Sequence, residues 1–170
     1  MLWTSEIEIS KSALEHNFNF IKNRLGENVQ FSSVVKGNAY GHGIEVFVPL
    51  AENCGISHFS VFSADEALRV QKSTLTNPTI LIMGMLDNGQ LEWAIKNEIE
   101  FFVFELDRLK QAALTAKRIG IPAKVHIEVE TGMNRTGFSK KEIFEVMNLL
   151  KQHIENLEFK GLCTHFAGAE

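Results

Sequence analysis

A lysine at the end of a short apolar run is the residue with the clearest chemical use in this chain. Lys36 follows two valines and precedes a turn with three glycines in seven residues, from Gly37 to Gly43. A side chain there leaves a buried strand and enters a pocket, where partial desolvation makes a lysine nucleophilic enough to form a Schiff base with a carbonyl compound. The single tyrosine of the chain, Tyr40, lies four residues later, whereas most of the other aromatic residues are the thirteen phenylalanines. The presence of one tyrosine among so many phenylalanines indicates that the Tyr40 hydroxyl has a functional role.

Strands and helices are predicted to alternate along the chain, and they must position Lys36. The expected strands lie at residues 30–36, 58–62, 79–83, 100–104, 123–129 and 157–164, after a leading half-buried strand at 6–9. The expected helices run from an N-cap at Ser10 up to Gly26, and at 44–53, 64–71, 89–96, 106–119 and 139–153. Serine followed three residues later by glutamate predicts capping boxes at Ser63 and Ser139. Most strands are continuous apolar runs, which is typical of a parallel sheet covered by helices.

This alternation predicts an α/β fold, either a (β/α)8 TIM barrel or an open doubly wound sheet. About six β/α units are visible where eight close a barrel, so a barrel would be incomplete. An incomplete barrel exposes two parallel edges, which proteins normally avoid. Either the chain is part of a longer protein, or a partner covers those edges. No linker or low-complexity tract divides residues 1–170, so we expect one domain.

Three polar side chains fall at or just beyond the carboxyl ends of predicted strands. They are Lys36, Arg135 and His165. Both the barrel and the open sheet place their functional sites at this end of the strands. These residues are therefore candidates for one site in either architecture.

Composition excludes several classes of function. A net charge of −4 and scattered basic residues argue against a nucleic-acid or anionic-membrane surface. No apolar run reaches the roughly 18 residues of a membrane span, and residues 1–25 lack the pattern of a signal peptide, so we expect a cytoplasmic protein. Cys54 and Cys163 form no CxxC pair and are expected to stay reduced. The six histidines show no metal-ligand spacing, and His126 is expected inside a strand, so no metal site is predicted.

Three strings in the chain share an order and spacing that point to one family. They are VVKGNAYGHG at 34–43, TGMNRTGF at 131–138 and GLCTHFA at 161–167. The first is nearly the lysine string of the alanine racemase family of pyridoxal-phosphate enzymes, which usually has alanine where this chain has Gly37. The other two resemble the family's TGM-x-R-x-GF loop and its THFA strand end. The resemblance extends from about residue 5 to the end of the chain.

The resemblance implies an N-terminal (β/α)8 barrel that binds pyridoxal 5′-phosphate at its mouth, then a C-terminal β domain, in a homodimer. The chain would be the N-terminal part of an enzyme that interconverts L- and D-alanine for peptidoglycan. Lys36 would hold the cofactor as a Schiff base and act as one of two catalytic bases, and Tyr40 would bind the cofactor phosphate. Arg135 would reach the cofactor's phenolic oxygen and the substrate. His165 would lie beside the pyridine ring.

The chain departs from the family at one position in the fifth strand. Many alanine racemases carry a carbamylated lysine seven residues before the arginine, and this chain has Glu128 there. We hypothesise that Glu128 supplies a permanent carboxylate that positions Arg135 through a charge-assisted hydrogen bond. The alternative is that Glu128 faces helices or solvent.

Competing interpretations remain open at this point. The family's second base, a tyrosine of its C-terminal domain, has no counterpart in these 170 residues, so we expect the chain alone to bind cofactor weakly and not to racemise efficiently. A non-enzymatic barrel that binds pyridoxal phosphate for cofactor homeostasis suits a short chain. A fold-type III decarboxylase and an inactive fragment that serves as an interaction module are further alternatives. The sequence does not determine which amino acid is the substrate.

Overall fold

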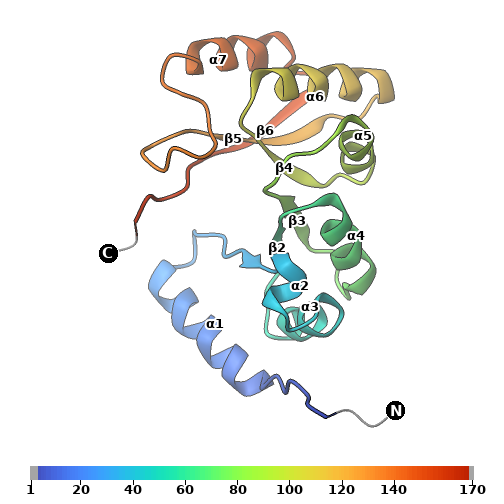
Figure 1. The fold of residues 1–170 in the computed structure, drawn as a ribbon, viewed down its shortest axis with the longest axis vertical. Helices are drawn as coiled ribbons and strands as arrows, with labels where there is room; N and C mark the ends of the chain where they lie inside the picture. The colour runs from blue at the N-terminus through green and yellow to red at the C-terminus, as the bar shows by residue number, and fades with distance from the viewer. Residues whose placement is uncertain (1–3, 169–170) are drawn as a thin grey trace. The chain divides into compact units, whose positions relative to one another are not determined.

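The computed structural model describes residues 4–168 and contains alternating strands and helices (Figure 1). The helices are α1 (Lys11–Leu25), α2 (Lys36–Tyr40), α3 (Ile44–Asn53), α4 (Ala64–Ser73), α5 (Asn88–Lys96), α6 (Leu106–Ile119) and α7 (Ile143–Gln152). The strands are β1 (Ser33–Val34), β2 (His58–Val61), β3 (Thr79–Ile82), β4 (Glu100–Val103), β5 (Ala123–Glu128) and β6 (Leu157–Cys163). The predicted alternation of strand and helix is therefore confirmed.

The six strands form one sheet in the sequential order β1-β2-β3-β4-β5-β6, which is not closed. The pairs β1–β2, β4–β5 and β5–β6 are parallel, with Ser33 opposite Phe59 in the first pair. A register shift between Val125 and His126 interrupts the pairing of β5 with β6. This arrangement confirms the predicted α/β class.

The chain divides into two compact units, Met1–Leu81 and Ile82–Glu170. In the first unit, α3 packs against α4, and α4 contacts β2. In the second unit, β4 and β5 bury alternate residues that are at most 1% exposed, in keeping with the period of two along a strand. Residues that are at most 1% exposed include Val35, Ile44, Val48, Phe59 and Val61 in the first unit, and Phe101, Val103, Leu109, Val125 and Ile127 in the second.

The predicted boundaries of helices and strands agree best with the structure where the sequence signals for a helix are strongest. Helices α3 and α6 have the predicted bounds, and the Ser10 side chain accepts from the Ala13 N–H to begin α1, as expected. The strand predicted at 6–9 is wrong, because these residues pair with no strand and Ile7 is 67% exposed. The first repeating strand is shorter than predicted, since its last predicted residue begins the turn α2.

The capping pattern at Ser139 forms a turn that precedes a helix. The Ser139 N–H and hydroxyl both donate to the Glu142 carboxylate, at 2.9 and 2.7 Å. Helix α7 begins only at Ile143, after this turn, so the helix predicted from residue 139 starts too early.

A polar cluster lies on strands of the second unit. His126 Nε2 is 2.6 Å from Glu100 Oε2, and Lys160 Nζ is 3.6 Å from the other oxygen of that carboxylate. His126 is thus in a strand, as expected. In the part of the chain that the structure describes, no three histidine, cysteine or acidic side chains gather as a metal site would require. Among residues 4–168, no helix is long and apolar enough to cross a membrane.

Glu52 is a buried carboxylate that holds the segment after α4. It is 9% exposed and accepts the Leu75 N–H at 2.7 Å, the Thr76 N–H at 3.2 Å and the Thr76 hydroxyl at 2.6 Å. A hydrogen bond to a charged group contributes about 1.5–3 kcal/mol.

We therefore expect Glu52→Ala to lower the free energy of unfolding by about 2–4 kcal/mol, because it removes three hydrogen bonds to a charged carboxylate. Urea unfolding followed by circular dichroism measures this loss. The exposed Glu27→Ala serves as the control and should change stability by less than about 0.5 kcal/mol. An equal effect of the two substitutions would show that Glu52 does not hold this segment.

Candidate functional site

Lys36 begins a left-handed turn, which we had not predicted. Gly37, Asn38, Ala39 and Tyr40 have φ angles of 61, 57, 53 and 53°. The left-handed conformation costs an L-residue about 1–2 kcal/mol, and only glycine adopts it freely. Three of these four residues are not glycine, so the surrounding structure must hold the turn in place.

Backbone hydrogen bonds close the turn. The Ala39 N–H donates to the Val35 carbonyl at 2.8 Å, and the Gly41 N–H donates to the Gly37 carbonyl at 3.1 Å. Ala39 is 4% exposed and anchors the middle of the turn in the core. Lys36 at the start is half-buried, and Tyr40 at the end is 65% exposed. The turn therefore presents an amine and a phenol within five residues of chain.

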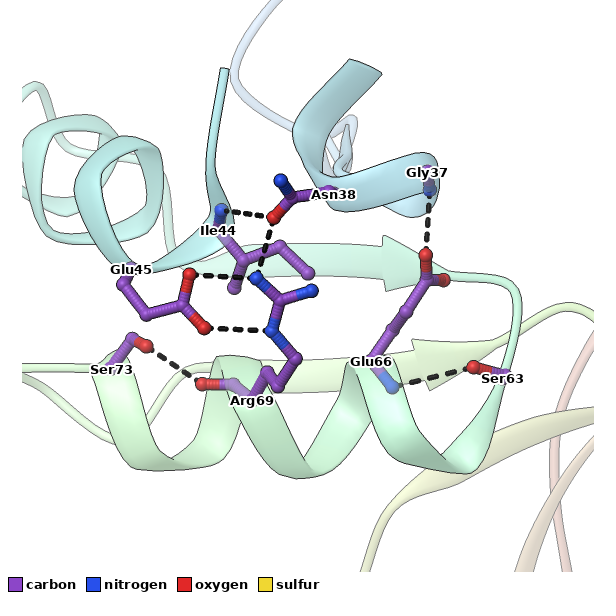
Figure 2. A network of polar contacts seen from close by, with 8 residues as sticks. All are labelled: Gly37, Asn38, Ile44, Glu45, Ser63, Glu66, Arg69 and Ser73. Carbon is purple, nitrogen blue, oxygen red and sulfur yellow. Dashed lines mark hydrogen bonds and ion pairs between the residues drawn. The ribbon is translucent and has the colours of Figure 1, made fainter. Parts of the chain in front are cut away.

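Two side chains of α4 hold the first half of the turn (Figure 2). Glu66 Oε1 accepts the Gly37 N–H at 2.6 Å, and its other oxygen accepts the Phe62 N–H at 2.9 Å. Arg69 donates through Nη2 to the Asn38 side-chain oxygen at 2.5 Å. Each of the two residues thus contacts one residue of the turn.

Glu66 departs from its predicted capping role. Ser63 Oγ accepts the Glu66 N–H at 3.3 Å, as an N-cap should. The reciprocal bond of a capping box, from the Ser63 N–H to the glutamate side chain, is replaced by the bonds to Gly37 and Phe62. The capping box predicted at Ser63 is therefore only half present, because the carboxylate is used by the turn.

Glu45 on α3 is the ion-pair partner of Arg69. Its two carboxylate oxygens lie 2.7 Å from Nε and 2.7 Å from Nη2 of the guanidinium, a bidentate arrangement. Hydrogen bonding to Arg69 lowers the pKa of Glu45 to about 2. The pair therefore stays ionised at neutral pH.

In the second unit, Glu130 organises the loop that carries Arg135. Its carboxylate accepts the Gly132 N–H, which holds the pKa of Glu130 below its ordinary value. Partial burial opposes this lowering, and the N–H groups of Asn134, Arg135 and Met133 add to it. Glu130 Oε2 is buried and makes no hydrogen bond among the described residues. The loop is thus folded around an internal negative charge.

A glycine closes the same loop. The Phe138 N–H donates to the Glu128 carbonyl at 2.8 Å, and the Glu130 N–H donates to the Phe138 carbonyl at 3.0 Å. Gly137 has a φ of 116°, and a Cβ at this position would lie 2.6 Å from the Glu130 nitrogen. Only glycine therefore allows the two ends of the loop to approach so closely.

Threonine hydroxyls join this loop to the segment that follows β6. Thr131 Oγ1 lies 2.6 Å from Thr164 Oγ1, which also donates to the Val129 carbonyl at 2.9 Å. The structure thereby brings together the two strings that contain Arg135 and His165. Both of these side chains are exposed, and neither forms a hydrogen bond or ion pair with another residue in 4–168.

Glu128 lies at the end of β5 and is 4% exposed. No hydrogen bond or ion pair joins it to Arg135 in the described part of the chain, so its role toward Arg135 stays a prediction. Burial, and then the charge of Glu128, raises the pKa of Cys163 to about 12. Cys54 and Cys163 are both free and partly buried.

The sheet is of the α/β type, the lysine turn follows its first strand, and the arginine loop follows its fifth strand. These features define a class of α/β proteins that carry their functional site at the carboxyl ends of the strands. The family described as "Alanine racemase, N-terminal domain" matches residues 9–170. The chain belongs to this family.

Curated relatives and solved structures agree with this assignment. Alanine racemase 2 of Caldanaerobacter subterraneus is 33% identical over 98% of this chain and 42% of its own length. The alanine racemase of Citrifermentans bemidjiense is 36% identical over 96% of this chain and 43% of its own length. The chain thus spans about two fifths of the length of these relatives.

Among solved structures, the alanine racemase of Clostridium difficile 630 in complex with cycloserine has a TM-score of 0.84 and 31% identity, over 92% of this chain and 43% of that one. The alanine racemase from Oenococcus oeni has a TM-score of 0.83 and 33% identity, over 94% and 46%. The sheet therefore corresponds to the N-terminal barrel part of these enzymes, as predicted.

Sequence reasoning missed Glu45, Glu66, Arg69 and Glu130. Glu66 and Arg69 stand three residues apart on the helix that follows the second strand, so they share one face next to the end of the first strand. That spacing was the available signal. Glu130 directly follows a predicted strand and precedes a glycine turn, but no spacing shows that backbone N–H groups converge on it.

The lowered pKa of Glu130 has a consequence for stability. A carboxylate whose pKa is lowered on folding stabilises the folded state above about pH 4.3, the ordinary glutamate pKa, and this contribution is lost as pH falls through the lowered pKa. We expect wild type to be more stable than Glu130→Gln at pH 7, with a difference that shrinks below about pH 4. Urea unfolding at several pH values measures this, with Glu155→Gln as an exposed control. A difference that does not depend on pH would contradict the role of the charge.

Proposed function

We propose that the chain carries the pyridoxal 5′-phosphate-binding part of an enzyme that interconverts L- and D-alanine. The observation that carries the proposal is the left-handed turn from Gly37 to Tyr40, which holds Lys36 half-buried at its start and the Tyr40 hydroxyl exposed at its end. Membership of the alanine racemase family supports the choice of reaction.

The side chains present fit this cofactor. Pyridoxal phosphate needs a primary amine for its aldehyde, and hydrogen-bond donors for its phosphate and its phenolic oxygen. Lys36, Tyr40, Arg135 and His165 provide one amine and three further donor groups. None of these four side chains has a hydrogen bond or ion pair to another residue within 4–168. Their donors are therefore available to an anionic ligand.

When bound, the cofactor supplies an electron sink that spreads the negative charge left when an α-proton is removed. Lys36 would hold the cofactor aldehyde through Nζ, and the same nitrogen would serve as the base that holds the α-proton. The Tyr40 hydroxyl donates to the phosphate. Arg135 donates to the phenolic oxygen and orients the substrate carboxylate, and His165 holds the pyridine ring.

The remaining parts of the proposal come from the family. Racemisation needs a base on each face of the substrate, and Lys36 accounts for one of them. We propose that residues 1–170 form one barrel-type domain of a cytoplasmic homodimer that contributes D-alanine to peptidoglycan. The substrate is a free amino acid, with alanine favoured by the names of the curated relatives. No nucleic acid or membrane partner is proposed.

The first test is the covalent linkage to Lys36. Protein made from the complete gene, incubated with pyridoxal 5′-phosphate, should show a visible absorbance band that borohydride abolishes, and mass spectrometry should place the reduced adduct on Lys36. Lys36→Ala should lose both signals, because no other amine stands in the turn, whereas the exposed Lys72→Ala should keep them. An adduct on another lysine, or none in wild type, would contradict the proposal. Formation of D-alanine from L-alanine separates a racemase from a protein that only binds the cofactor.

Glu128 provides a second test. We propose that its buried carboxylate supplies the negative charge that positions Arg135, and Glu128→Gln removes that charge with little change of shape. We expect kcat/KM for alanine to fall by roughly 10- to 100-fold, as misplacement of a positioning group does. Glu158→Gln on the exposed part of β6 is the matched control. Unchanged kinetics in Glu128→Gln would show that Arg135 does not depend on Glu128.

A further inference from the structure

Helix α4 contacts the lysine turn through two residues on one face. Glu66 receives the Gly37 N–H, and Arg69, three residues later, donates to the Asn38 side chain (Figure 2). Residues three apart on a helix lie on the same side. Helix α4 therefore holds two consecutive left-handed residues of the turn.

Asn38 connects Arg69 to the residues that follow the turn. Its side-chain oxygen accepts both the Arg69 guanidinium, at 2.5 Å, and the Ile44 N–H, at 3.2 Å. Its backbone carbonyl accepts the Gly43 N–H at 2.9 Å. One residue with a φ of 57° thus links α4, the turn and the start of α3.

Arginine suits this place better than lysine. The Arg69 guanidinium bonds Glu45 through Nε and Nη2 and uses Nη2 again for Asn38. A planar fork with several fixed donors allows all three bonds in one geometry, whereas an ammonium group has no such fork. Figure 2 shows the Arg69 guanidinium between the Glu45 carboxylate and the Asn38 side chain.

Because the ion pair between Arg69 and Glu45 is exposed, its effect on the local conformation can be distinguished from its effect on global stability. The side chains of Arg69 and Glu45 are 40% and 56% exposed. Exposed ion pairs contribute little to the global free energy of unfolding. The contact is therefore suited to fixing a local conformation rather than to holding the unit together.

We infer that Arg69 is a positioning residue that fixes the left-handed turn through Asn38 and thereby sets Lys36 and Tyr40 for the cofactor. The first half of this inference concerns the protein alone, and the second half rests on the proposed function. Arg69 touches neither cofactor nor substrate in this account, and it acts through Asn38.

Hydrogen exchange tests the first half without cofactor. In Arg69→Ala, the amide hydrogens of residues 37–43 should exchange at least tenfold faster than in wild type, while those of β2 and of residues 48–53 in α3 stay unchanged. Arg69→Lys should restore only part of the protection. Arg118→Ala is the matched control, because it removes another exposed ion pair, 2.7 Å from Glu92, and should leave residues 37–43 unaffected. Unchanged exchange in both Arg69 variants would overturn the inference.

Cofactor binding tests the second half. Titration with pyridoxal 5′-phosphate, followed by absorbance, should give an at least tenfold weaker dissociation constant for Arg69→Ala than for wild type or Arg118→Ala, with the unfolding midpoints of the two variants alike. Equal affinity despite faster exchange would overturn the link between Arg69 and the site. Failure of wild type to bind would count against the proposed function, and the exchange result would still decide whether Arg69 fixes the turn.

Discussion

The left-handed turn from Gly37 to Tyr40 is the constraint on which the rest of the site depends. Such a conformation persists in non-glycine residues only where neighbouring contacts determine it from several sides. Here the buried Ala39, the backbone bonds to Val35 and the contacts from α4 do so. The turn carries the amine of Lys36 at its start and the hydroxyl of Tyr40 at its end.

The same device appears in the arginine loop of the second unit. A carboxylate accepts backbone N–H groups in both places, Glu66 from Gly37 and Glu130 from Gly132. In each place a carboxylate thus holds loop backbone, from helix α4 in the case of Glu66 and from within the loop in the case of Glu130. The four side chains that we propose bind the cofactor, Lys36, Tyr40, Arg135 and His165, form no hydrogen bond or ion pair with another residue within 4–168. A phosphate-bearing cofactor with a phenolic oxygen matches this division between backbone and side chains.

The sequence predicted the parts of the molecule that obey regular periods. Helices α3 and α6 and the alternation of strands with helices followed from apolar spacing and from stop signals such as Gly120. Pattern reasoning placed a turn after Lys36 but did not find its left-handed conformation, because left-handed residues have no period and only glycine among them signals it. It also misread Glu66 as a capping residue, since one partner of its carboxylate, the Gly37 N–H, lies 29 residues away in sequence and only the fold brings the two together. The three sequence strings at 34–43, 131–138 and 161–167 indicated the family, but they did not indicate the residues that stabilise the conformation of these strings.

A crystal structure of the protein from the complete gene with pyridoxal 5′-phosphate tests the central claim most directly. The account requires positive φ angles from Gly37 to Tyr40, a guanidinium of Arg69 bonded to Asn38, and the Lys36 amine joined to the cofactor. A right-handed or extended backbone at these four residues, or a cofactor bound away from Lys36, would contradict it.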